Sequence, residues 1–159
     1  MKRISTVFLQ AVVVLIGMVT LVLLIRLPLT EGRAQNLDLP SIYLDPLILY
    51  GYAVSIAFFI ALHQAFKLLQ YIGQHRAFSP KAAKTLKTIK YCAITLSVSI
   101  VVAGVYIRIT HSQEDDPAGF LAMCIMTALA SIVVATAAAM LEKLLQHAVD
   151  MKSENELTI

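Results

Sequence analysis

Residues 4–25 read ISTVFLQAVVVLIGMVTLVLLI and carry no charge, with Arg3 before them and Arg26 after them. At a rise of about 1.5 Å per residue, a helix of this length crosses the roughly 30 Å of hydrocarbon in a bilayer. Secretory signal peptides also begin with an apolar run, but theirs spans about 7–15 residues and ends beside a small-residue cleavage site. Because this run is longer and residues 30–34 offer no convincing site of that kind, the stretch predicts an uncleaved membrane-spanning helix.

Three further uncharged stretches lie between Asp45 and Lys67, between Lys90 and Arg108, and between Asp116 and Glu142. We therefore expect a single transmembrane domain over residues 1–159, with spans over about residues 4–26, 45–66, 90–108 and 118–141. The composition agrees, because 58% of the residues are hydrophobic, 14% are charged and the mean hydropathy is +0.77. The predicted fold class is all-α, an integral membrane four-helix transmembrane bundle, which leaves no segment for a separate soluble catalytic domain.

The net charge of +3, from 13 basic and 10 acidic residues, is distributed unevenly among the loops. Six basic residues and no acidic one occur from residue 67 to residue 90: Lys67, Arg76, Lys81, Lys84, Lys87 and Lys90. The segments 26–45 and 108–116 are richer in acidic residues. Since basic loops remain in the cytoplasm, we expect a cytoplasmic loop over residues 67–89, a short cytoplasmic tail over residues 143–159, and both termini in the cytoplasm.

Small side chains recur every four residues in the last three spans, a spacing that lets helices approach closely in lipid. These residues are Ala53, Ala57, Ala61 and Ala65, then Thr95, Ser99 and Ala103, and finally Thr127, Ser131, Ala135 and Ala139. The first span offers only Gly17. We expect the last three helices to pack tightly and the first to be more exposed to lipid, although small residues are common in such helices whatever their packing.

The basic loop contains a helix start. Ser79 before Pro80 is typical of an N-cap followed by a proline in the first turn, so residues 80–88 should be helical and continue into the third span. The lysines that follow recur every three residues and are suited to anionic headgroups or to an acidic partner. Candidate contacts to lipid or a partner are Ser79, Pro80, Lys81, Lys84, Lys87 and Lys90. The alternative, that these lysines only fix the topology, remains open.

Chemistry inside the membrane requires ionisable groups there, and the spans hold few. His63 is the candidate intramembrane polar residue, as a hydrogen-bonded interhelical contact in preference to a titrating switch. Glu142 and Lys143 are interpreted as boundary residues that help to cap the last helix. No nucleophile and base, no metal-ligand spacing and no phosphate-binding glycine pattern occurs, so we expect no enzyme activity, no cofactor and no metal. The basic loop lacks interleaved aromatic residues, so direct nucleic-acid binding is not expected.

Two segments resemble a known family. Residues 77–91 read AFSPKAAKTLKTIKY and residues 153–159 read SENELTI. Together they resemble the third-span entrance and the C-terminal ending of the bacterial membrane proteins grouped as domain of unknown function 2975 (DUF2975). The resemblance implies a small four-helix protein of the bacterial cytoplasmic (inner) membrane, without an established activity. Members of that family are frequently encoded beside a small helix-turn-helix regulator, which implies a soluble cytoplasmic regulator as a partner.

Two hypotheses for function follow. In the first, a non-enzymatic membrane protein docks a soluble partner through the lysine-rich helix and the tail, whose apolar ending beside the terminal carboxylate suits docking better than solvation alone. The tail contacts are Asn155, Glu156, Leu157 and Ile159, unless the tail is simply frayed. In the second, the protein is a transporter or permeability component for a small or hydrophobic solute, with a path lined by His63, Thr95, Ser99, Thr127 and Ser131. The expected partners are membrane lipids, a soluble regulator and further copies of this chain.

Overall fold

The computed structural model describes residues 2–30, 43–74, 76–110 and 118–157, which form four α-helices and, within these ranges, no strand. The helices are α1 (Lys2–Thr30), α3 (Pro46–Gly73), α4 (Pro80–Thr110) and α5 (Ala118–Leu157). Each is long and apolar enough to cross a bilayer. The predicted all-α fold with four membrane-spanning helices is therefore confirmed.

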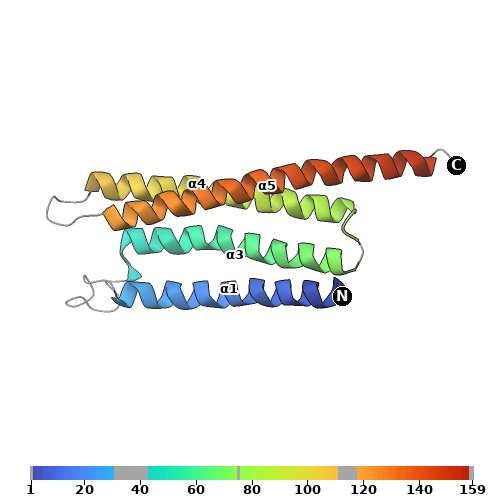
Figure 1. The fold of residues 1–159 in the computed structure, drawn as a ribbon. Helices are drawn as coiled ribbons and strands as arrows, with labels where there is room; N and C mark the ends of the chain where they lie inside the picture. The colour runs from blue at the N-terminus through green and yellow to red at the C-terminus, as the bar shows by residue number, and fades with distance from the viewer. Residues whose placement is uncertain (1, 31–42, 75, 111–117, 158–159) are drawn as a thin grey trace.

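The four helices pack in the order in which they occur in the chain, as Figure 1 shows. α1 packs on α3, α3 on α4 and α4 on α5, and the α4–α5 interface is the most extensive. The chain ends and the connection between α3 and α4 lie at the same end of the molecule. We call this end the basic end, because the exposed side chains of Arg76, Lys81, Lys84 and Lys87 lie there.

The core lies along α4, which has a neighbour on each side. Its buried residues are Ala82, Ala83, Thr85, Leu86, Ile89, Ala93, Ser97, Gly104 and Ile107. On α5, Ala128, Ala135, Ala138 and Glu142 are buried, whereas α3 has no fully buried residue. Large apolar side chains are exposed along all four helices, as expected where lipid replaces water around a protein.

Only part of the small-residue pattern lies at these interfaces. Ala135 is buried, but Thr95 and Thr127 are exposed, and their hydroxyl groups donate to carbonyl groups of their own helices. The prediction that these two threonines lie between helices is wrong, because α4 is buried along a second stripe of small residues with Ala93, Ser97 and Gly104. The buried small residues of α5 are Ala128, Ala135 and Ala138. α1 approaches α3 closely at Gly17, where an added Cβ would lie 2.9 Å from Leu62 Cδ2.

The helices are longer than the spans expected from charge alone. Residues 67–73 belong to α3 and residue 80 begins α4, so the expected cytoplasmic loop over residues 67–89 is mostly helical. Ser79 caps α4 as predicted, since the backbone N–H of Ala82 donates to its side-chain oxygen at 3.3 Å and to its carbonyl oxygen at 3.0 Å. The segment expected as a tail from residue 143 continues α5 without a break to Leu157.

A proline in the last part of α1 is compensated by a tyrosine of α3. Pro28 is buried and has no backbone N–H, so it cannot donate to the carbonyl group of Leu24, four residues earlier. The Tyr52 hydroxyl donates to that carbonyl group at 3.0 Å. Because lipid offers no replacement donor, this bond both satisfies the Leu24 carbonyl and joins α1 to α3.

Tyr52→Phe is therefore expected to lower the free energy of unfolding by about 1 kcal/mol, because it leaves the Leu24 carbonyl without a donor. In a Pro28→Ala background the alanine N–H supplies that donor, so the same change should cost much less. Denaturant unfolding of the four proteins in detergent measures both steps. Equal costs of Tyr52→Phe in the two backgrounds would show that the tyrosine does not compensate for the proline.

Candidate functional site

The length of α5 places part of it outside the membrane. Its 40 residues span about 60 Å, twice the roughly 30 Å of hydrocarbon in a bilayer. The segment from Ala118 to Leu141 contains no charged residue, and the first charge follows at Glu142. From Glu142 to Leu157 the helix continues for about 24 Å. We call this part the α5 extension.

An ion pair joins α4 and α5 where the α5 extension begins. The Lys90 ammonium group donates to Glu142 Oε2 at 2.7 Å, and the Glu142 side chain is only 8% exposed. The same ammonium group lies 4.9 Å from the centre of the Tyr91 ring. The interpretation of Glu142 as a residue that helps to cap the last helix is therefore wrong, because α5 continues to Leu157 and Glu142 pairs with α4. Lys90, expected to contact lipid or a partner, instead fixes α4 against α5.

Beside the ion pair, three helices meet in a small apolar cluster. Leu86 and Ile89 of α4 pack against Ala138 of α5. The half-buried residues packed around them are Ala65 and Leu68 of α3 and Leu145 of α5. The ion pair and the apolar cluster both hold the start of the α5 extension against α4.

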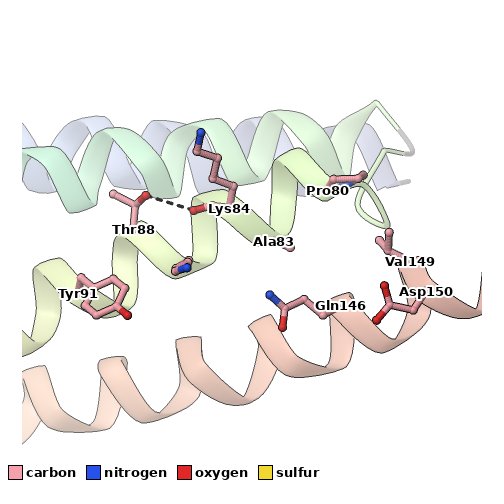
Figure 2. A pocket seen from close by; sticks show the side chains of 9 residues that line it. Pro80, Ala83, Lys84, Thr88, Tyr91, Gln146, Val149 and Asp150 are labelled. Atoms are coloured by element: carbon pink, nitrogen blue, oxygen red, sulfur yellow. Dashed lines mark hydrogen bonds between the residues drawn. The ribbon is translucent and has the colours of Figure 1, made fainter.

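A groove of about 560 Å³ opens beside these contacts, between the first three turns of α4 and the α5 extension (Figure 2). It is lined by Pro80, Ala83, Lys84, Lys87, Thr88, Tyr91, Gln146, Val149 and Asp150. In Figure 2 Gln146 and Asp150 lie on α5, across the groove from Tyr91 and Thr88 of α4. The lining contains two lysines and one carboxylate, that of Asp150, so its net charge is +1.

The groove contains some of the residues singled out from the sequence, and others lie elsewhere. Pro80, Lys84 and Lys87 line it, Ser79 caps the helix that carries them, and Lys81 is exposed outside the lining. Asn155, Glu156 and Leu157 lie in the last turn of α5, whereas Ile159 is outside the described residues. His63 is exposed on α3, so among the described residues it does not form the expected interhelical contact.

Sequence reasoning missed the α5 side of the groove. Glu142, Gln146 and Asp150 are spaced four residues apart, so they lie along one face of a helix. This polar stripe was visible in the sequence, but it carries information only if the helix is known to continue past Lys143. Tyr91, the first residue of the third uncharged stretch after Lys90, also lines the groove.

The residues suggested for a solute path are not brought together. Thr95, Thr127 and Ser131 each donate to a carbonyl group of their own helix. A second groove between α4 and α5, of about 470 Å³, lies within the apolar part and is lined by apolar side chains, Cys124 and Arg108. Among the described residues, no carboxylate, histidine or cluster of hydroxyl groups lines it.

These features define a membrane protein with four spanning helices, whose last helix projects well beyond the bilayer. The chain belongs to the family described as Protein of unknown function (DUF2975), whose model matches residues 28–159. It is 42% identical over 161 residues to the Uncharacterized membrane protein YoaS of Bacillus subtilis (strain 168), with all of both chains covered. No solved structure matches it. The resemblance noted in residues 77–91 and 153–159 is confirmed, and the matched region includes the whole groove.

Proposed function

We propose that this chain is a non-enzymatic docking protein of the bacterial cytoplasmic membrane, with its basic end and both termini in the cytoplasm. The observation that carries the proposal is the α5 extension, a helix that continues about 24 Å beyond the last uncharged residue of the span. A helix needed only to cross the membrane could end at Lys143. A projecting helix presents a surface of fixed shape to a soluble protein.

The outer face of the α5 extension has the pattern of a docking helix. Leu144 and Met151 are 64% and 61% exposed, and Ala148 lies between them on the same face. Spacing of three and four residues places all three side chains in one stripe. The opposite face carries Glu142, which is paired with Lys90 of α4, so the stripe is turned away from α4 and is available to a partner.

The charge of the basic end indicates the chemistry of the partner. Four basic side chains are exposed there: Arg76, Lys81, Lys84 and Lys87. Their positive electrostatic potential speeds association with an acidic protein surface. We therefore expect a soluble partner that offers an apolar groove with an acidic rim. A helix-turn-helix regulator of the kind encoded beside members of this family is the candidate that the resemblance supplies.

Leu144→Gln/Met151→Gln is expected to reduce partner recovery about tenfold or more, because it removes both large apolar side chains of the stripe. The assay is cross-linking of tagged protein in native membranes followed by mass spectrometry. The matched control, Lys143→Gln/Ser153→Gln, changes other faces of the same exposed stretch and should retain the partner. Deletion of residues 151–159 should reduce recovery without affecting membrane insertion. A partner profile that is unchanged in both the double variant and the deletion would contradict the docking proposal.

A further inference from the structure

The groove between α4 and the α5 extension does not include the stripe of Leu144, Ala148 and Met151, so its ligand is considered separately from the soluble partner. Its position relative to the bilayer follows from where charge begins on its two walls. α4 carries no charged residue for more than four turns after Tyr91, and α5 carries none for more than six turns before Glu142. The groove therefore begins at the edge of the apolar belt, the depth at which tyrosine side chains and lipid headgroups are found.

The distances along α4 match the thickness of a headgroup layer. Lys87 lies four residues from Tyr91 and Lys84 lies seven, which corresponds to about 6 Å and 10 Å along the helix axis. The polar layer on each side of a bilayer is about 5–8 Å thick. A lipid whose acyl chains pass Tyr91 would thus have its phosphate at the level of Lys87, with Lys84 just beyond it.

The donors and acceptors in the groove define the headgroup. The Thr88 hydroxyl already donates to the Lys84 carbonyl oxygen at 3.1 Å. The other side-chain donors of the lining are the ammonium groups of Lys84 and Lys87, the amide of Gln146 and, at the membrane side, the Tyr91 hydroxyl. In Figure 2 Lys84 points away from α5, and rotation about its four-carbon stem brings the ammonium group over the groove. Asp150, on the opposite wall, accepts hydrogen bonds only.

We propose that this groove binds one anionic phospholipid, with the phosphate between Lys84, Lys87 and Gln146 and a headgroup hydroxyl donating to Asp150. Phosphatidylglycerol has this chemistry, since its headgroup combines a single negative charge with hydroxyl groups. One such charge neutralises the net charge of +1 on the lining. Basic pockets between transmembrane helices are established sites for anionic headgroups. The volume of about 560 Å³ lies within the range of small-molecule sites.

The Lys90–Glu142 ion pair lies next to the membrane side of the groove. Lys90 lies against the Tyr91 ring and is itself held by Glu142, so the tyrosine at the membrane side of the groove has a fixed neighbour. Pro80, Ala83 and Val149 contribute apolar side chains to the lining. The site thus has an ion-paired part at its membrane side and exposed lysine side chains at its outer side.

The test is native mass spectrometry of delipidated protein mixed with equal amounts of phosphatidylglycerol and phosphatidylcholine in detergent. The wild-type protein should retain one phosphatidylglycerol in preference to phosphatidylcholine. Lys84→Gln/Lys87→Gln should lose about tenfold in that occupancy, whereas the matched control Lys81→Gln/Lys143→Gln, with the same change in net charge, should retain it. Equal losses in the two double variants would overturn the proposal, because binding would then follow net charge and not this groove.

Two further arms identify the ligand. Asp150→Asn should reduce the preference for phosphatidylglycerol over phosphatidic acid, which lacks the glycerol hydroxyls; an unchanged preference would overturn the role of Asp150. Excess soluble glycerol phosphate should not displace the lipid, because it lacks the acyl chains beside Tyr91. Displacement at equal concentration would identify a phosphate site in place of a lipid site and overturn the assignment.

Discussion

Lys90→Met is expected to lower the unfolding temperature of the protein in detergent by on the order of 10 °C. The change leaves the Glu142 carboxylate, which is 8% exposed, without its partner between α4 and α5. An unpaired buried charge costs far more than the pair itself contributes, because the remaining group loses water and gains nothing in return. Thermal unfolding followed by loss of monodisperse protein on size exclusion measures the effect.

Two variants separate loss of the pair from loss of a positive charge. Lys143→Met removes a neighbouring exposed lysine and should change the unfolding temperature by little. Glu142→Met added to Lys90→Met removes the stranded carboxylate and should restore most of the stability, since an apolar pair of similar volume is often tolerated. A double variant no more stable than Lys90→Met would show that the contact does not act as a buried pair.

Gly104→Leu is expected to separate α4 from α5 and to give protein that aggregates on extraction. Gly104 is buried, and a Cβ at this position would lie 3.6 Å from the Cβ and 3.8 Å from the Sγ of Cys124. A single methyl group therefore fits in ordinary contact, but a longer side chain must displace α5. Overpacking of this kind costs about 1–3 kcal/mol and more where a backbone has to move.

Gly104→Ala is the matched control and should leave the extracted protein monodisperse, with stability within about 1 kcal/mol of wild type. Cys124→Ala should partly rescue Gly104→Leu, because it removes the sulfur atom that faces the glycine. Extraction in mild detergent and size exclusion distinguish these outcomes. Aggregation of Gly104→Ala would mean that the helices approach more closely than the structure indicates.

The four spans could be predicted because they depend on a property of each residue, namely whether it carries a charge. The start of α4 at Ser79 and Pro80 was equally local, since capping depends on residues within one turn. The far ends of the helices were not predictable in this way. The α5 extension carries charged residues, and no residue in it stops a helix before Leu157, so charge marks where the membrane ends but not where the helix does.

The candidate site depended on information that one sequence does not hold. Lys90 and Glu142 are 52 residues apart, and their contact requires a particular rotation of each helix about its own axis. The small residues illustrate the same limit, because α4 carries two stripes of them and only the one with Ala93, Ser97 and Gly104 is buried. The lysines of the groove were found, since basic residues beside a span stand out, but their opposite wall was not.

The order in which the helices pack has a consequence for how the protein is made. Because every extensive contact among the described helices joins consecutive ones, each helix finds its neighbour already in the bilayer as synthesis proceeds. α3 can dock on α1 before α4 exists, and no early helix must wait for a distant one. Assembly of this kind involves only short loop closures, which favours fast folding. The Lys90–Glu142 pair then forms last, when α5 leaves the ribosome, and it locks the completed row of helices.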